Sequence, residues 1–220
     1  MIYIIGAVIS AGISLAVAIL MAKHTNRLIA DRDLGENIPG YTRTVGTMMA
    51  LAAIVVISGV CGYQICRRAV SVGAMLELMC CYYAILAAAI TDWKTKIIPD
   101  QIPLALLGAR LVLFVLELLT GDGNVSELVR SLLSGIVCMV ALIVIGNLGK
   151  NGIGGGDIKL LAAVAFMTNL MMLMQILMFA FLSCAAVGIL AILAKKLTFK
   201  SAVAFAPFMY LGFVLMCVMI

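Results

Sequence analysis

Charged residues are scarce in this sequence. Asp, Glu, Lys and Arg together make up 11% of the 220 residues, whereas hydrophobic residues make up 65%. Soluble domains typically contain about 25% charged and about 45–50% apolar residues. The composition therefore excludes a soluble globular domain, a disordered chain and a nucleic-acid-binding protein. It predicts an all-α fold, a polytopic bundle of membrane-spanning helices in a lipid bilayer.

Histidine and closely paired cysteines are also lacking. His24 is the only histidine, and the seven cysteines form no CxxC pair. Zinc sites and Ser/His or Cys/His nucleophiles need such partners. We therefore expect no metal site, no cofactor and no catalytic thiol or serine. The cysteines are expected to be small buried hydrophobes, and His24 is expected in a solvated loop.

Long apolar runs define the helices. A helix rises about 1.5 Å per residue, so a hydrocarbon core of about 30 Å needs about 20 apolar residues. The run 158–194 is too long for one crossing, and we divide it at its only polar pair, Thr168-Asn169. Its first part, 158–167, is too short to cross alone. Eight helices are thus predicted: 2–22, 45–65, 72–91, 102–119, 128–148, the two parts of 158–194, and 201–219.

The distribution of positive charge favours eight helices over seven. In an eight-helix arrangement, four connections share one side, and that side carries most of the positive residues: Lys23, Arg27, Arg32, Arg43, Lys94, Lys96, Lys150, Lys159, Lys195, Lys196 and Lys200. The other side has only Arg67, Arg68 and Arg130. Because positive loops stay in the cytoplasm, this asymmetry predicts a multi-pass protein of the cell membrane with both termini outside the cytoplasm.

Three charged residues fall within or near apolar runs. Arg110 and Glu117 are seven residues apart and share a helix face, and Glu77 lies in another run. Charges inside a membrane usually face the bundle interior and pair with one another. Structural pairing is the favoured interpretation, and a substrate contact is the alternative.

Two further acidic motifs lie at helix ends on the predicted cytoplasmic side. Asp92 ends the third apolar run and is followed by Pro99 and Asp100, and we expect Pro99 to stop the helix and Asp100 to cap the next one. The segment 152–157 is rich in glycine and ends in Asp157. Asp157 could be a helix N-cap after a flexible loop, whereas a phosphate-binding loop is disfavoured because no strand precedes it.

Two carboxyl groups that share one site cannot easily both ionise, so the pair shares a proton. Such a pair activates a water molecule and protonates a leaving amine without a metal ion. If Asp92 and Asp157 meet, the chemistry they predict is aspartic peptide hydrolysis.

The two motifs resemble those of the type IV prepilin peptidase family, which includes the archaeal preflagellin peptidases. That family has an Asp followed after five residues by Ile-Pro-Asp/Asn, and a later Gly-x-Gly-Asp-x-Lys-Leu-Leu-Ala segment. The corresponding residues here are 92–100 and 154–162. A third family motif, Pro-Phe-Gly-Pro-Phe, corresponds to Ala204-Phe205-Ala206-Pro207-Phe208, in which Ala replaces the first Pro and the Gly.

The resemblance implies that Asp92 and Asp157 are catalytic. It implies that Gly154, Gly156, Lys159, Pro99 and Asp100 shape the site. It also implies the substrate: a prepilin whose short basic leader peptide is removed from an apolar pilin transmembrane helix at the cytoplasmic membrane face.

The resemblance covers residues 72–220, for which we expect a six-helix catalytic core. Residues 1–71 are expected to form two additional helices joined by the cytoplasmic loop 23–44. Bifunctional family members carry CxxC motifs in an N-terminal methyltransferase domain, and this loop has no cysteine. We therefore expect a peptidase without N-methyltransferase activity, like those that serve Flp or tight-adherence pili.

Two other functions remain open at this stage. A proton-coupled transporter also uses intramembrane acids, but it is expected to have internal repeats, and none is evident. A presenilin-like intramembrane protease shares the Gly-x-Gly-Asp motif but is expected to have a catalytic Asp deep inside a span.

Overall fold

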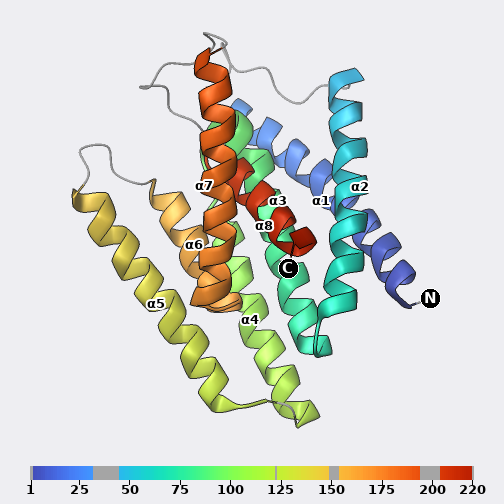
Figure 1. Cartoon of the computed structure of the whole chain (residues 1–220), viewed down its shortest axis with the longest axis vertical. Helices are drawn as coiled ribbons and strands as arrows, with labels where there is room; N and C mark the ends of the chain where they lie inside the picture. The colour runs from blue at the N-terminus through green and yellow to red at the C-terminus, as the bar shows by residue number, and fades with distance from the viewer. Residues whose placement is uncertain (1, 32–44, 122, 149–153, 194–203, 220) are drawn as a thin grey trace.

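The computed structural model describes residues 2–31, 45–121, 123–148, 154–193 and 204–219, and these ranges are helical with no strand (Figure 1). Eight helices occur in them: α1 (Ile2–Asp31), α2 (Val45–Arg68), α3 (Val72–Thr95), α4 (Gln101–Thr120), α5 (Val125–Leu148), α6 (Gly155–Met167), α7 (Leu170–Leu193) and α8 (Ala206–Met219). Six of these are long and apolar enough to cross a membrane. The predicted all-α membrane bundle is confirmed, with α6 and α8 as shorter helices.

The helices alternate in direction (Figure 1). As a result, the start of α4 and the start of α6 lie at the same end of the bundle as the end of α3. This is the arrangement that the eight-helix prediction requires. It brings the two acidic motifs to one end of the molecule, which we call the acidic-motif end.

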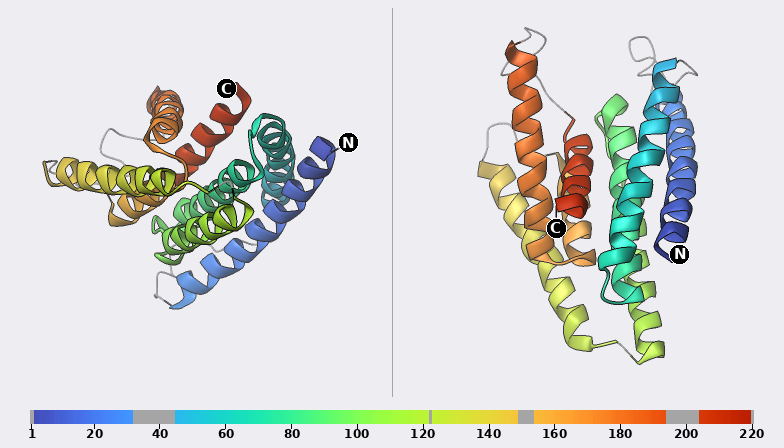
Figure 2. Two further views of the ribbon diagram at one scale, coloured as in Figure 1. Left: turned by 90° about the horizontal axis from the view of Figure 1, so that it is seen from below. Right: turned by 45° about the vertical axis from the view of Figure 1, so that its right-hand side comes forward.

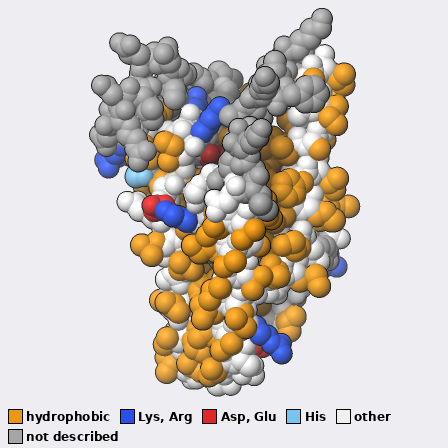
Figure 3. All heavy atoms as spheres, turned by 90° about the vertical axis from the view of Figure 1, so that its left-hand side faces the viewer, with side chains coloured by type: hydrophobic (Ala, Val, Ile, Leu, Met, Phe, Trp, Pro, Cys, Tyr) orange, Lys and Arg blue, Asp and Glu red, His pale blue; other side chains and the backbone are white. Residues whose placement is uncertain are grey.

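Helix α3 lies at the centre of the bundle. It packs against α1, α2, α4, α6 and α8, and Figure 2 shows α1 and α2 on one side of it and α5–α8 on the other. Hydrophobic side chains cover most of the face seen in Figure 3, and charged side chains form separate groups toward its two ends. An apolar belt between two charged ends is the surface expected of a membrane protein.

The first helix is longer than predicted. Its apolar run ends at residue 22, yet α1 continues to Asp31. Residues 23–31 contain no Gly or Pro, so nothing in them breaks a helix that is already formed. His24 therefore lies on α1, half-buried, and its predicted place in a solvated loop is wrong. The rest of the predicted loop, 32–44, lies outside the described residues.

The break between α6 and α7 falls where the polar pair predicted it. The N–H of Thr168 still bonds to the carbonyl of Val164, and Asn169 then adopts a φ of 148°. The Asn169 side-chain oxygen accepts a hydrogen bond from the N–H of Met172 at 2.8 Å, which caps α7. Asn tolerates positive φ and makes an effective cap, so two polar residues suffice to reverse the chain.

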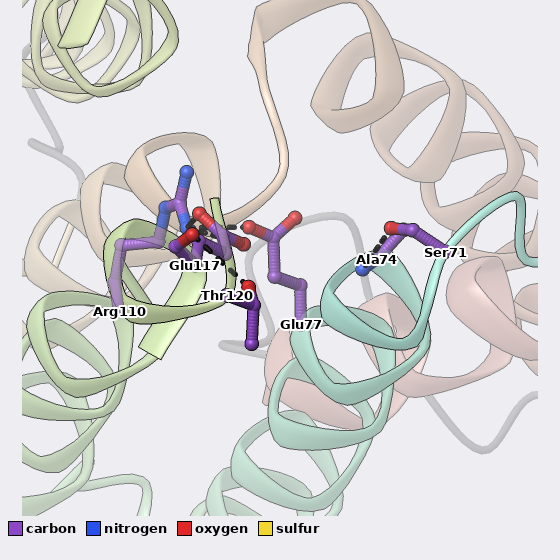
Figure 4. Close-up of polar contacts among 6 residues, drawn as sticks. All are labelled: Ser71, Ala74, Glu77, Arg110, Glu117 and Thr120. Atoms are coloured by element: carbon purple, nitrogen blue, oxygen red, sulfur yellow. Dashed lines mark hydrogen bonds and ion pairs between the residues drawn. The ribbon is translucent and has the colours of Figure 1, made fainter. Parts of the chain in front are cut away.

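A charged cluster joins α3 to α4 at the opposite end of the bundle (Figure 4). Arg110 is 3% exposed, and its Nη1 atom lies 2.6 Å from Glu77 and 3.3 Å from Glu117. This confirms the predicted structural pairing. Charges at this depth are tolerated because they are paired and face the bundle interior.

Candidate active site

Asp92 lies inside the last turn of α3. Asp92 is only 5% exposed, and its backbone carbonyl accepts a hydrogen bond from the N–H of Lys96 at 2.9 Å. Lys96 adopts the left-handed conformation, with φ at 51°, and ends the helix there. The helix therefore stops before Pro99, not at it. Pro99 begins the approach to α4, which starts at Gln101.

Asp157 lies in the first turn of α6. That helix starts at Gly155, three residues before the apolar run, and its N-cap position is Gly154. Asp157 is therefore not the N-cap residue, and the capping interpretation is wrong. The side chain is half-buried.

The glycines before Asp157 allow α6 to come close to the α3–α4 connection. A Cβ atom on Gly156 would lie 3.1 Å from the Cβ of Ile98, so a side chain there would press on the residue that precedes Pro99. A Cβ atom on Gly154 would lie 2.9 Å from Oδ2 of Asp157 itself. Gly156 thus permits the two motifs to pack together, and Gly154 leaves space for the Asp157 carboxyl group.

The two carboxyl groups are within electrostatic reach of each other. Burial raises the pKa of Asp157 from 3.8 to about 6, and the negative charge of Asp92 raises it as well. Asp92 therefore lies near enough to act on Asp157 through its charge. This is consistent with the expectation that the two motifs approach each other, while a shared site and the catalytic roles of its members stay predictions.

Lys159 and Asp100 contact each other and not the acidic pair. Nζ of Lys159 lies 2.7 Å from Oδ1 of Asp100, and both side chains are more than half exposed. Asp100 occupies the N-cap position of α4, as predicted, but its side chain makes no capping hydrogen bond. This exposed ion pair links the start of α4 to the start of α6 and contributes little stability.

One group at the site was not anticipated from the sequence. The backbone N–H of Ala206, at the start of α8, donates a hydrogen bond to Oδ2 of Asp92 at 3.0 Å. The only sequence signal for it is Pro207, because proline favours the first turn of a helix. A main-chain donor has no side-chain identity, so no pattern of residue types reveals which carboxylate it meets.

The comparisons with known proteins agree with this geometry. The profile of the type IV leader peptidase family matches residues 79–192, which is more than half of the chain and includes both acids. The chain belongs to this family. No solved structure matches it.

Relatives of this leader peptidase family member include proteins named prepilin leader peptidase/N-methyltransferase. The chain is 30% identical over 142 residues to such a protein from Burkholderia pseudomallei, which covers 64% of the chain and 45% of the relative. It is 30% identical over 134 residues to one from Bacillus subtilis, covering 60% of the chain and 50% of the relative. The chain thus spans about half the length of the curated relatives it matches.

Proposed function

We propose that this chain is a membrane-embedded aspartic endopeptidase that removes the short basic leader peptide from type IV prepilins. The proposal is supported by the position of Asp92 and Asp157 at one end of the bundle, where burial and the Asp92 charge raise the pKa of Asp157 to about 6. Such a pair holds one proton and one negative charge together. That is the state that aspartic hydrolysis requires.

Family membership and the names of the relatives support the substrate class. The matched residues, 79–192, contain both acidic motifs, so the shared region is the one that holds the proposed chemistry. We propose Flp or tight-adherence-like prepilins as the substrates. The fit is chemical: an apolar pilin helix stays in the bilayer while its leader reaches the acidic-motif end.

We place that end at the cytoplasmic membrane face. The described connections and helix ends there include Lys23, Arg27, Lys94, Lys96 and Lys159. Excess Lys and Arg mark the cytoplasmic side of a membrane protein. A leader peptide added to inverted membrane vesicles is therefore expected to be cut, whereas intact right-side-out vesicles are expected to leave it uncut.

We further propose that cleavage is not followed by N-methylation. The 220 residues contain no CxxC pair, and we assign residues 72–220 as the catalytic core and 1–71 as two supporting helices. Mass spectrometry of the mature pilin N-terminus reports cleavage, cut site and methylation in one measurement. A methylated N-terminus produced by this chain alone would contradict this part of the proposal.

The decisive experiment replaces each acid separately in cells that also express a prepilin. Asp92→Asn and Asp157→Asn are expected to abolish processing while the protein still inserts. Glu127→Gln is the matched control, because Glu127 is an exposed acid in the first turn of α5, at the opposite end. Normal processing by either aspartate variant would refute the assignment.

A further inference from the structure

In the first turn of α8, only the backbone N–H of Ala206 is available to an acceptor outside the helix, and that acceptor is Asp92. The N–H groups of Phe208 and Met209 bond to the carbonyl of Phe205, and Pro207 has no N–H. The N–H of Ala206 is directed instead to Oδ2 of Asp92 at 3.0 Å, in a buried contact. The side chain of Asp92, on α3, therefore accepts a hydrogen bond from the start of α8, as a capping residue would, although it is remote from α8 in the sequence.

This contact favours the ionised form of Asp92. A carboxylate is a stronger hydrogen-bond acceptor than a neutral carboxyl group, and the N-terminus of a helix carries a partial positive charge, so both oppose the cost of burying the Asp92 charge. The backbone N–H of Phe205 faces the same carboxylate, and Lys96 at the end of α3 adds a positive charge. Asp157 is the acidic group that faces it from α6.

Asp157 has no comparable support. Among the described residues it accepts no hydrogen bond, and burial and the charge of Asp92 both favour its protonated form. Its place in the first turn of α6 favours the anion, but that dipole does not prevent the net shift toward protonation. Burial disfavours the charge on both acids, so the difference between them comes from the backbone donors at the start of α8 and from Lys96.

We propose that the backbone N–H of Ala206 assigns the roles within the acidic pair: it holds Asp92 as the carboxylate that accepts a proton from water, and leaves Asp157 as the acid. This inference rests on the proposed peptidase function. Ala206 is a positioning residue, because it touches Asp92 and not the substrate.

The resulting reaction balances in two steps. Water adds to the scissile carbonyl carbon while Asp92 takes a water proton and Asp157 gives its proton to the carbonyl oxygen, which forms a gem-diol. Asp92 then protonates the amide nitrogen, the C–N bond breaks, and Asp157 recovers a proton from the gem-diol. The products are a carboxylic acid and an amine, and both aspartates return to their starting states.

The test removes the donor and keeps the site. Ala206→Pro deletes the N–H, and Ala206→Gly is the matched control that keeps it. We expect Ala206→Pro to lower kcat by about 10- to 100-fold, as loss of a hydrogen bond to a charged group does. We also expect the acidic limb of its pH profile to move to higher pH, while Ala206→Gly keeps the limb in place. If the two variants have the same rate and profile, the inference is wrong.

A second variant tests the same N–H in case Ala206→Pro does not fold. Replacing Ala206 by lactic acid turns the amide into an ester, which removes the N–H while the side chain and the backbone path are kept. The same loss of kcat and the same shift of the acidic limb are expected, and an unchanged ester variant overturns the inference.

Infrared difference spectra test the proton's location without a substrate. At pH 5, the spectrum of wild type minus Asp157→Asn is expected to contain the band of a protonated carboxyl group, and that of wild type minus Asp92→Asn is not. The reverse pattern overturns the assigned roles. If the wild type cleaves no prepilin, the proposed function fails; if it cleaves and only these spectra disagree, this inference alone fails.

Discussion

At the scale of single residues, we expect the protonation of Asp157 to determine how the proposed activity depends on pH. An aspartate normally ionises near pH 3.8, whereas burial and the Asp92 charge raise the pKa of Asp157 to about 6. A protonated Asp157 is present below that pH and is lost above it. We expect kcat to fall by about tenfold per pH unit on the alkaline side.

This profile is measured with purified protein in nanodiscs and a fluorogenic leader peptide between pH 4.5 and 8.5. The Glu127→Gln variant is expected to give the same curve as the wild type. A rate that stays constant up to pH 8 contradicts the role of Asp157 as the acid.

Two neighbouring glycines provide a second residue-scale prediction. A Cβ on Gly154 would lie 2.9 Å from Oδ2 of Asp157, and a Cβ on Gly155 meets nothing within 4 Å. Because the end of a side chain can move, Gly154→Ala is expected to displace the carboxyl group at little cost in stability. We expect its kcat to fall about tenfold or more with an unchanged Tm, whereas Gly155→Ala keeps both. Equal rates for the two variants would contradict a spacing role for Gly154.

Sequence reasoning found the acids but not their surroundings. Asp92 and Asp157 are singled out as candidate site residues by their residue type and by the spacing of the motifs around them, both of which can be read from the sequence. Capping propensity placed Asp100 correctly at the N-cap of α4, but the pairing of its side chain with Lys159 depends on how α4 and α6 approach each other. The tertiary contact with Lys159 thus replaces the capping hydrogen bond that local propensity favours for the Asp100 side chain.

At the scale of helices, the packing of α8 on α7 controls where the Ala206 N–H lies. A Cβ on Gly212 would overlap the carbonyl oxygen of Ile176 and lie 2.7 Å from the N atom of Ala180. These are backbone atoms that cannot rotate away, so Gly212→Ala must push the helices apart. We expect a loss of about 1–3 kcal/mol in stability together with reduced activity.

Thermal unfolding in detergent and the cleavage assay together test this prediction. Gly188→Ala is the matched control, because a Cβ there meets nothing within 4 Å. If Gly212→Ala keeps the wild-type Tm and rate, the close approach of α7 and α8 is not required.

The helices themselves were largely predictable, and their ends were not. Apolar runs located all eight, because the bilayer demands continuous hydrophobic stretches. The ends depend on backbone conformation: α3 stops where Lys96 turns left-handed, and α1 continues to Asp31 because no breaker intervenes. Hydropathy reports neither effect.

At the scale of the whole molecule, the Arg110 cluster holds α3 and α4 together at the end remote from the acidic pair. Removing one partner of a buried ion pair leaves uncompensated charge and costs about 3–5 kcal/mol. We expect that loss for Arg110→Met, because Glu77 and Glu117 then lose the arginine that both contact. Glu117→Gln is expected to cost less, since Arg110 keeps Glu77.

Equilibrium unfolding in mixed detergent micelles measures both values. Arg130→Met serves as the control, because Arg130 is exposed on α5. Equal stability of the Arg110 and Arg130 variants would show that the cluster is dispensable.

The hydrogen bond between α3 and α8 joins two segments that are synthesised at different times. Asp92 emerges from the ribosome long before Ala206, because α8, a helix of 14 residues, follows α7 in the chain. A growing chain therefore holds both aspartates in the membrane while the donor for one of them is still untranslated. If the proposed function and the role of Ala206 hold, a chain terminated within α7 is expected to insert both aspartates and leave a co-expressed prepilin uncut.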